Sequence, residues 1–146
     1  MTAYLLDVNV LIALLDPSHV QHDIAHDWFA ATGHKAWASC PITENGVLRI
    51  IGNPRYPNSP GSPAAVVPLL AGLCALPGHI HWADDISVLD TAAFDATRLL
   101  AFRQITDSYL LALARAHKGQ LATLDQRLVT DAVIGGKKSL HRIGID

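Results

Sequence analysis

Cysteine is scarce in this 146-residue sequence, and long hydrophobic runs are missing from it. The two cysteines, Cys40 and Cys74, match no zinc-site spacing, so we expect reduced thiols and no zinc. No apolar run reaches the roughly 18 residues of a membrane-spanning helix. The N-terminus shows neither a basic stretch nor a small-residue cleavage pattern. We therefore expect a cytoplasmic protein without membrane contact.

An excess of charge of either sign is also missing. The formal net charge is −2, which argues against a general nucleic-acid coat, because such proteins are normally basic. It does not exclude an enzyme that holds nucleic acid through a few local contacts. Among the 13 acidic residues, Glu44 is the one glutamate. Aspartates favour caps, turns and strand ends over helix surfaces, so the position of each acid is informative.

Apolar segments of two kinds alternate along the chain and predict its elements. Short apolar runs indicate strands at 3–7, 35–39, 79–83, 120–125 and 139–145. Longer or amphipathic stretches indicate helices at 9–15, 18–32, 41–51, 64–75, 91–101 and 107–118. This alternation predicts an α/β fold, with a parallel sheet of about five strands and helices on both faces. The length suits a single domain over residues 1–146.

Caps and breakers support several of these boundaries. Ser18 and Thr106 are expected N-caps, Pro41 suits a first helical turn, and Gly119 is an expected helix stop. The clearest loop is GNPRYPNSPGSP at 52–63, which we expect to be a mobile surface excursion.

The run AYLLDVNVLIALL carries an acid, Asp7, near the middle of a highly apolar stretch. An unpaired carboxylate there is costly to desolvate, so a neutralising partner is expected. Three other acids share its topological position: Glu44 and Asp125 follow expected strands, and Asp107 opens a helix. Functional groups gather outside the carboxyl ends of parallel strands. The four acids are therefore expected to converge.

Convergence of these acids has an electrostatic consequence. Two carboxylates about 5 Å apart repel by roughly 3 kcal/mol at an effective dielectric constant near 20. Either some acids are protonated or a divalent cation lies among them. Oxygen ligands, with Asn9 two residues after Asp7, suit Mg²⁺ or Mn²⁺ better than zinc. Such an ion can activate water to attack a phosphodiester.

Four motifs together resemble the PIN-domain family, and more narrowly the VapC-type toxins of bacterial toxin–antitoxin pairs. They are LLDVNVLIALL at 5–15, TEN at 43–45, TDSYLLALA at 106–114 and TLDQRL at 123–128. The resemblance runs from residue 3 to about residue 143, and the motifs are specific in combination because they keep their order and their strand–helix context.

The resemblance implies a PIN-like three-layer fold and a Mg²⁺-dependent endoribonuclease, with Mn²⁺ as a possible substitute. It implies an RNA substrate, a homodimer and a cognate VapB-type antitoxin that occludes the active site. Asp7, Glu44, Asp107 and Asp125 would form the catalytic and metal-binding set, with Asn9 and Thr106 as supporting polar groups. All four acids match the family pattern, whereas the 52–63 loop is less typical.

Two other functions remain open at this stage. An idle PIN-like binding scaffold is one, although the retention of all four acids argues against it. A phosphotransfer enzyme with Asp7 as nucleophile is the other, although Asn9 stands where that chemistry favours an acid.

Other polar groups are interpreted as surface features. They are the helical face His19, His22 and His26, the pair Asp84–Asp85 as a turn and cap, and the basic group Lys137, Lys138, His141 and Arg142, for which RNA contact is equally open.

Overall fold

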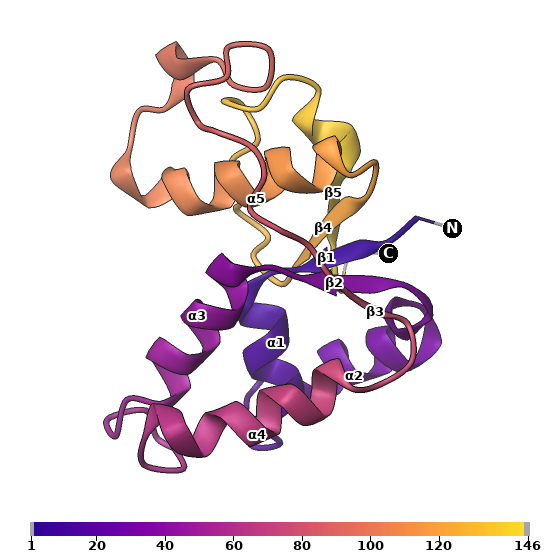
Figure 1. Ribbon diagram of the computed structural model, residues 1–146, viewed down its shortest axis with the longest axis vertical. Coiled ribbons are helices and arrows are strands. Elements are labelled where there is room, and N and C mark those ends of the chain that lie inside the picture. The colour runs from indigo at the N-terminus through magenta and orange to yellow at the C-terminus, as the bar shows by residue number, and fades with distance from the viewer. Residues whose placement is uncertain (1, 145–146) are drawn as a thin grey trace.

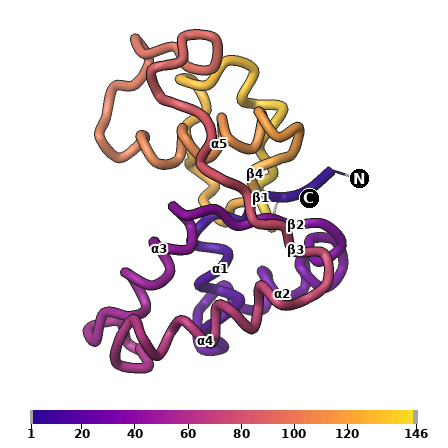
Figure 2. Tube along the Cα trace, in the orientation of Figure 1, coloured from indigo at the N-terminus to yellow at the C-terminus, as the bar shows by residue number. Residues whose placement is uncertain are grey.

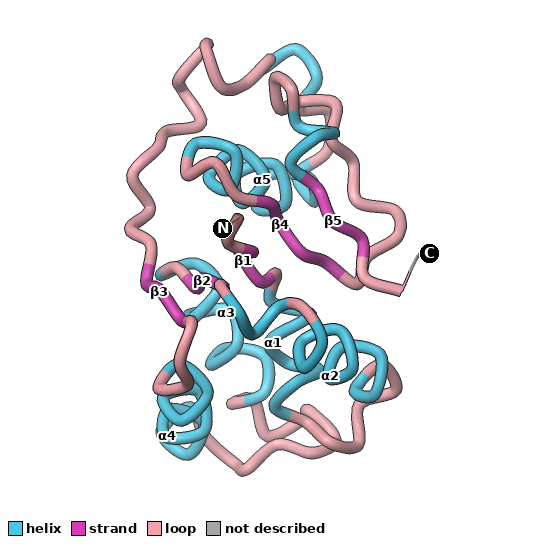
Figure 3. Tube along the Cα trace, turned by 90° about the vertical axis from the view of Figure 1, so that its right-hand side faces the viewer, coloured by secondary structure: helices cyan, strands magenta, loops and turns pink. Residues whose placement is uncertain are grey.

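A five-stranded parallel sheet forms the middle layer of the computed structural model, which describes residues 2–144. The strands lie in the order β3-β2-β1-β4-β5, and each neighbouring pair is parallel (Figure 3). In chain order they are β1 (Tyr4–Leu6), β2 (Trp37–Ser39), β3 (His79–His81), β4 (Gln120–Thr123) and β5 (Leu140–Arg142).

Helices cover both faces of this sheet, as the sequence predicts. In chain order they are α1 (Val8–Leu15), α2 (His22–Ala31), α3 (Pro41–Ile51), α4 (Pro63–Cys74) and α5 (Ile105–Ala116). Helices α1 to α4 lie on one face and α5 lies on the other (Figure 1). After β3 the chain crosses to the α5 side and forms the long segment 83–104 (Figure 2). Within residues 2–144, no helix is long and apolar enough to cross a membrane.

Adjacent leucines of β1 show how the two cores are separated. Leu6 packs with Val10 and Val47 on the α1–α4 side, whereas Leu5 packs with Leu110 and Leu121 on the α5 side. Successive side chains of a strand point to opposite faces, so a strand covered on both sides is apolar at every position. Polar groups of such strands are therefore confined to their ends, where Asp7 stands.

The predicted helix at 91–101 is wrong. Only a 3-10 turn, Ala96–Arg98, forms there. The segment pairs instead with residues 132–134: the amide of Asp95 donates to the Ala132 carbonyl at 2.9 Å, and the amide of Ile134 donates to the Ala93 carbonyl at 3.1 Å. These tertiary bonds use backbone groups that a helix would need, so the helical preference of the sequence is overridden.

Two of the predicted caps are also wrong. Helix α2 begins at His22, after Gln21, because residues 16–22 form successive turns in which the amide of His19 donates to the Asp16 carbonyl and the amide of His22 to the His19 carbonyl, both at 3.0 Å. Helix α5 begins at Ile105, which puts Thr106 inside the first turn instead of at the cap. Pro41 does occupy the first turn of α3, as predicted.

Gly119 follows α5 as expected, but the reason is space. The left-handed residue is Lys118, with φ of 58°, and a Cβ at Gly119 would lie 2.4 Å from the carbonyl oxygen of Ala3. The turn out of α5 therefore needs glycine so that the chain can pass against β1.

The 52–63 loop is fastened to the body of the protein. The Tyr56 hydroxyl donates to the buried carboxylate of Asp16, and the Ser59 hydroxyl donates to the Ile51 carbonyl at 2.6 Å. These bonds tie the excursion to the ends of α1 and α3.

Candidate functional site

Asp7 is the first residue after β1 and the N-cap of α1. Its Oδ1 accepts a hydrogen bond from the amide of Val8 at 2.8 Å, which satisfies one of the free amides at the start of the helix. The side chain is only 6% exposed. The acid in the apolar run is thus held at the point where a buried strand passes into a buried helix.

Thr123, the last residue of β4, organises the polar groups around Asp7. Its hydroxyl donates to Oδ2 of Asp7 at 2.8 Å, and it accepts from the Asn9 amide at 3.2 Å and from the backbone amide of Asp125 at 3.1 Å. The side-chain oxygen of Asn9, Oδ1, in turn accepts from the backbone amide of Leu124 at 3.2 Å. One hydroxyl therefore fixes two acids and the asparagine against one another.

Thr123 is the first residue of the TLDQRL motif, but the sequence alone assigns it no role. The available signal was its position two residues before Asp125 at the end of a predicted strand. Its role depends on β1 pairing with β4, which a sequence pattern alone does not establish.

Asp107 lies in the first turn of α5, where the negative charges of Asp7 and Asp125 act on its carboxylate. Burial, then the negative charges of Asp7 and Asp125, raises the pKa of Asp107 to about 6. Burial also raises the pKa of Asp7, against the opposing hydrogen bonds from Thr123 and the amide of Val8. Three carboxylates from β1, α5 and the end of β4 thus form one electrostatically coupled group, here called the aspartate centre (Asp7, Asp107 and Asp125).

A hollow of about 220 Å³ opens beside the aspartate centre. Asp107 and Asp125 line it, and so do two cations, Arg103 and Arg127. Oδ1 of Asp125 is oriented by the backbone amide of Arg127 at 2.8 Å. The hollow therefore presents acids together with positive charges.

Glu44 stands in a different environment, here called the Glu44 cluster (Ser39, Glu44, His79 and His81). Its Oε2 accepts from the Ser39 hydroxyl at 2.7 Å and is 3.0 Å from Nδ1 of His81. Nε2 of His79 lies 2.8 Å from the Ser39 hydroxyl oxygen. Because that hydroxyl donates to Glu44, His79 is the donor in this contact. Glu44 is not among the charges that raise the pKa of Asp7 or Asp107.

The predicted convergence is therefore reached by three acids, with Asn9 beside them. Glu44 has partners of its own, and Thr106 is exposed in the first turn of α5. Among residues 2–144, no group of three or more acidic, histidine or cysteine side chains is arranged to hold a metal ion by itself. Magnesium often binds through only one or two carboxylates and keeps several waters, so the aspartate centre still fits such an ion.

The structure also describes the predicted histidine face of α2 and the pair Asp84–Asp85. Nδ1 of His22 contacts the Ala13 carbonyl at 2.6 Å, and its ring stacks on His26. The turn and cap predicted at Asp84–Asp85 are wrong, because residues 82–87 form neither a turn nor a helix; Asp85 pairs with His117 at 3.1 Å.

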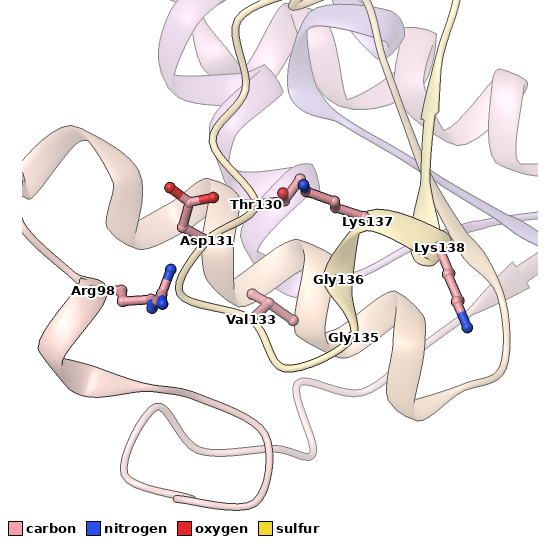
Figure 4. A pocket seen from close by; sticks show the side chains of 8 residues that line it. All are labelled: Arg98, Thr130, Asp131, Val133, Gly135, Gly136, Lys137 and Lys138. Carbon is pink, nitrogen blue, oxygen red and sulfur yellow. The ribbon is translucent and has the colours of Figure 1, made fainter.

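Two of the four residues in the predicted basic group, His141 and Arg142, make contacts within the protein. His141 stacks against Trp28 with ring centres 5.5 Å apart, and burial lowers the pKa of its imidazole. Arg142 donates to the Leu128 carbonyl at 3.0 Å. Lys137 and Lys138 instead join Arg98 around a hollow of about 300 Å³ (Figure 4). That hollow contains one acid, Asp131, and thus lacks the paired carboxylates of the aspartate centre.

Comparison with known proteins gives one family match and several relatives. The sequence matches the PIN domain model over residues 4–131. It is 48% identical to Ribonuclease VapC44 of Mycobacterium tuberculosis strain ATCC 25618 / H37Rv, over 92% of this chain and 94% of that protein. It is 42% identical to Ribonuclease VapC39 of the same strain, over 92% and 96% of the two chains. Ribonuclease VapC38 is 40% identical, over 86% and 87%.

Proposed function

The chain belongs to the PIN-domain family, and from this premise we propose that it cleaves RNA as the toxin of a VapBC-type toxin–antitoxin pair. The observation that carries the proposal is the aspartate centre, in which burial and two neighbouring acids raise the pKa of Asp107 to about 6. Acids that raise one another's pKa repel one another when ionised, and a cation among them relieves that repulsion. The names of the relatives support RNA as the substrate.

Asp7 and Asp107 would hold a Mg²⁺ ion, with Mn²⁺ as a substitute, because hard oxygen ligands suit both. When bound, the ion supplies positive charge that stabilises the phosphodiester under attack and makes water easier to deprotonate. Thr123 and the amide of Val8 keep Asp7 in one orientation. Asp125, the exposed member of the centre, would orient the attacking water.

Glu44 completes the proposed catalytic set from outside the aspartate centre. The Ser39 hydroxyl and His81 both bond its Oε2, which fixes the carboxylate at the end of β2 and β3. Glu44 would act on the cation through intervening water. Asn9 and Thr106 would support the set as polar groups.

We also propose two protein partners, a cognate VapB-type antitoxin and a second copy of this chain, with the complex located in the cytoplasm. A largely apolar hollow of about 350 Å³ lies beside Glu44 and is lined by Leu48, Val67, Leu70 and Ala71. An antitoxin segment seated there would reach the Glu44 side of the active site and block access to it.

The test uses antitoxin-free protein incubated with total RNA in Mg²⁺, Mn²⁺ or EDTA, with cleavage ends mapped by sequencing. Discrete cuts that require the cation would support the nuclease. A folded protein that binds Mn²⁺ but cuts no RNA would contradict the proposed activity on that RNA pool. A folded wild-type protein that neither binds Mn²⁺ nor cuts RNA would favour the alternative, a catalytically idle PIN-like scaffold.

A further inference from the structure

Phe102 is an aromatic side chain that the fold holds out into solvent. It begins the 3-10 turn Phe102–Gln104 just before α5, and it is 82% exposed. The turn is fixed by the Gln104 side chain, whose carbonyl accepts from the amide of Leu100 at 2.8 Å and whose amide donates to the Arg98 carbonyl at 3.0 Å. These hydrogen bonds fix the turn in the conformation that exposes the Phe102 ring.

The same turn borders the aspartate centre. Arg103 and Gln104 line the hollow that contains Asp107 and Asp125. The Arg103 guanidinium carbon lies 5.6 Å from the centre of the Phe102 ring, within the range of a cation–π contact. The Phe102 ring therefore lies beside a cation, Arg103, that itself lines the acidic hollow.

A phosphodiester that approaches the aspartate centre meets repulsion from its carboxylates. Arg103 and Arg127, which share the hollow, offer positive charge to the phosphates on either side of the scissile bond. An exposed aromatic ring offers a stacking surface for a base, and single-stranded RNA leaves bases free to stack in this way. Adjacent residues therefore offer a positive charge for a phosphate, from Arg103, and a stacking surface for a base, from Phe102.

We propose that Phe102 and Arg103 form a subsite for single-stranded RNA, in which Phe102 stacks an unpaired base next to the cleavage point and Arg103 binds a flanking phosphate. This inference rests on the proposed ribonuclease function and adds to it two residues of this chain that would bind the RNA strand. Stacking on an aromatic face tolerates every base, so the subsite selects unpaired RNA without selecting its sequence.

The test measures the affinity of Phe102→Ala for a labelled single-stranded RNA of random sequence and for a duplex of equal length. EDTA is present so that the RNA stays intact. Leu89→Ala is the matched control, because Leu89 is 85% exposed and lies outside the hollow. We expect Phe102→Ala to weaken single-strand binding by about 5- to 100-fold, with little change for the duplex and none for the control. Phe102→Trp should retain the affinity and Phe102→Leu should lose it.

Arg103→Ala tests the phosphate contact separately. Its affinity should fall less steeply with salt, with a slope lower by about one released ion. An unchanged salt slope would overturn the role of Arg103.

Equal RNA binding by Phe102→Ala and the wild type would overturn the stacking role. So would a loss of dimer mass by light scattering in that variant, which would assign Phe102 to a protein interface. A wild type that cuts RNA while Phe102→Ala binds normally refutes the subsite alone. A wild type that neither binds nor cuts RNA refutes the proposed function as well.

Discussion

The aspartate centre and the Glu44 cluster lie at the same edge of one sheet, but Asp107 in the first and Glu44 in the second have opposite electrostatic surroundings. Glu44 receives a hydroxyl and an imidazole on one oxygen. Asp107 receives the negative charges of Asp7 and Asp125, and its pKa rises to about 6. The donors around Glu44 balance its negative charge locally, whereas the acids around Asp107 repel its carboxylate and leave a place for a cation. The difference favours the aspartate centre over the Glu44 cluster as the place of the proposed ion.

The largest effect is expected from Asp107→Asn. Loss of this carboxylate removes a proposed ligand, and RNA cleavage should fall by on the order of 10³-fold or more, equivalent to about 4 kcal/mol. Cleavage would be followed on total RNA in Mg²⁺, with circular dichroism to check that the variant is folded. Substantial activity in a folded variant would remove Asp107 from the chemistry.

Thr123→Val should have the next largest effect. The substitution keeps the shape but leaves Asp7 and Asn9 without their shared hydroxyl. We expect Mn²⁺ affinity to fall by about 10- to 100-fold, as for partners that orient a metal ligand. Isothermal titration would measure it, with Thr123→Ser as the control that retains the hydroxyl. Unchanged affinity in Thr123→Val would mean that Asp7 needs no such support.

The pH dependence of stability tests the repulsion directly. The pKa of Asp107 is raised above its ordinary value, so the folded state binds this proton more tightly than the unfolded chain does. The resulting destabilisation is absent below about pH 3.8 and complete above about pH 6. From pH 4.5 to 7.5, the wild type should lose on the order of 2 kcal/mol relative to Asp107→Asn. Urea unfolding in EDTA measures this, and parallel pH profiles would contradict the raised pKa.

Glu44→Gln should have a smaller effect on cleavage. Glutamine keeps an oxygen for Ser39 and His81 but loses the charge, and we expect about a tenfold loss of cleavage, equivalent to 1.4 kcal/mol. Mn²⁺ affinity should change little. If Glu44→Gln abolished Mn²⁺ binding as fully as Asp107→Asn, the distinction between the two regions would fail.

The smallest effect is expected from His81→Ala. The His81 side chain is 53% exposed, and exposed ion pairs contribute about 1 kcal/mol at most. Cleavage should fall by no more than about fivefold in a kinetic assay at pH 7.5. A larger loss would show that His81 does more than hold Glu44.

Particular residues show how far the sequence alone could predict this molecule. That Asp7 lies near other acids could be predicted, because an acid inside an apolar strand-to-helix run is costly to bury alone. The positions of Asp107 at a helix start and of Asp125 at a strand end predicted that both lie near it; their catalytic roles stay predictions. The roles of Thr123 and His81 could not, because they depend on β4 pairing with β1 and on β3 pairing with β2. The helix expected at 91–101 failed for the same reason, since pairing with residues 132–134 decides that segment.

Calorimetric titration of Mn²⁺ at pH 6, in two buffers of different ionisation enthalpy, tests the central claim most directly. We expect the wild type to bind Mn²⁺ and to release a proton from Asp107, whose pKa is about 6. Both signals should disappear in Asp107→Asn and persist in Glu44→Gln. Binding of equal strength in wild type and Asp107→Asn, or no binding by the wild type, would contradict the claim that the three aspartates form a cation site.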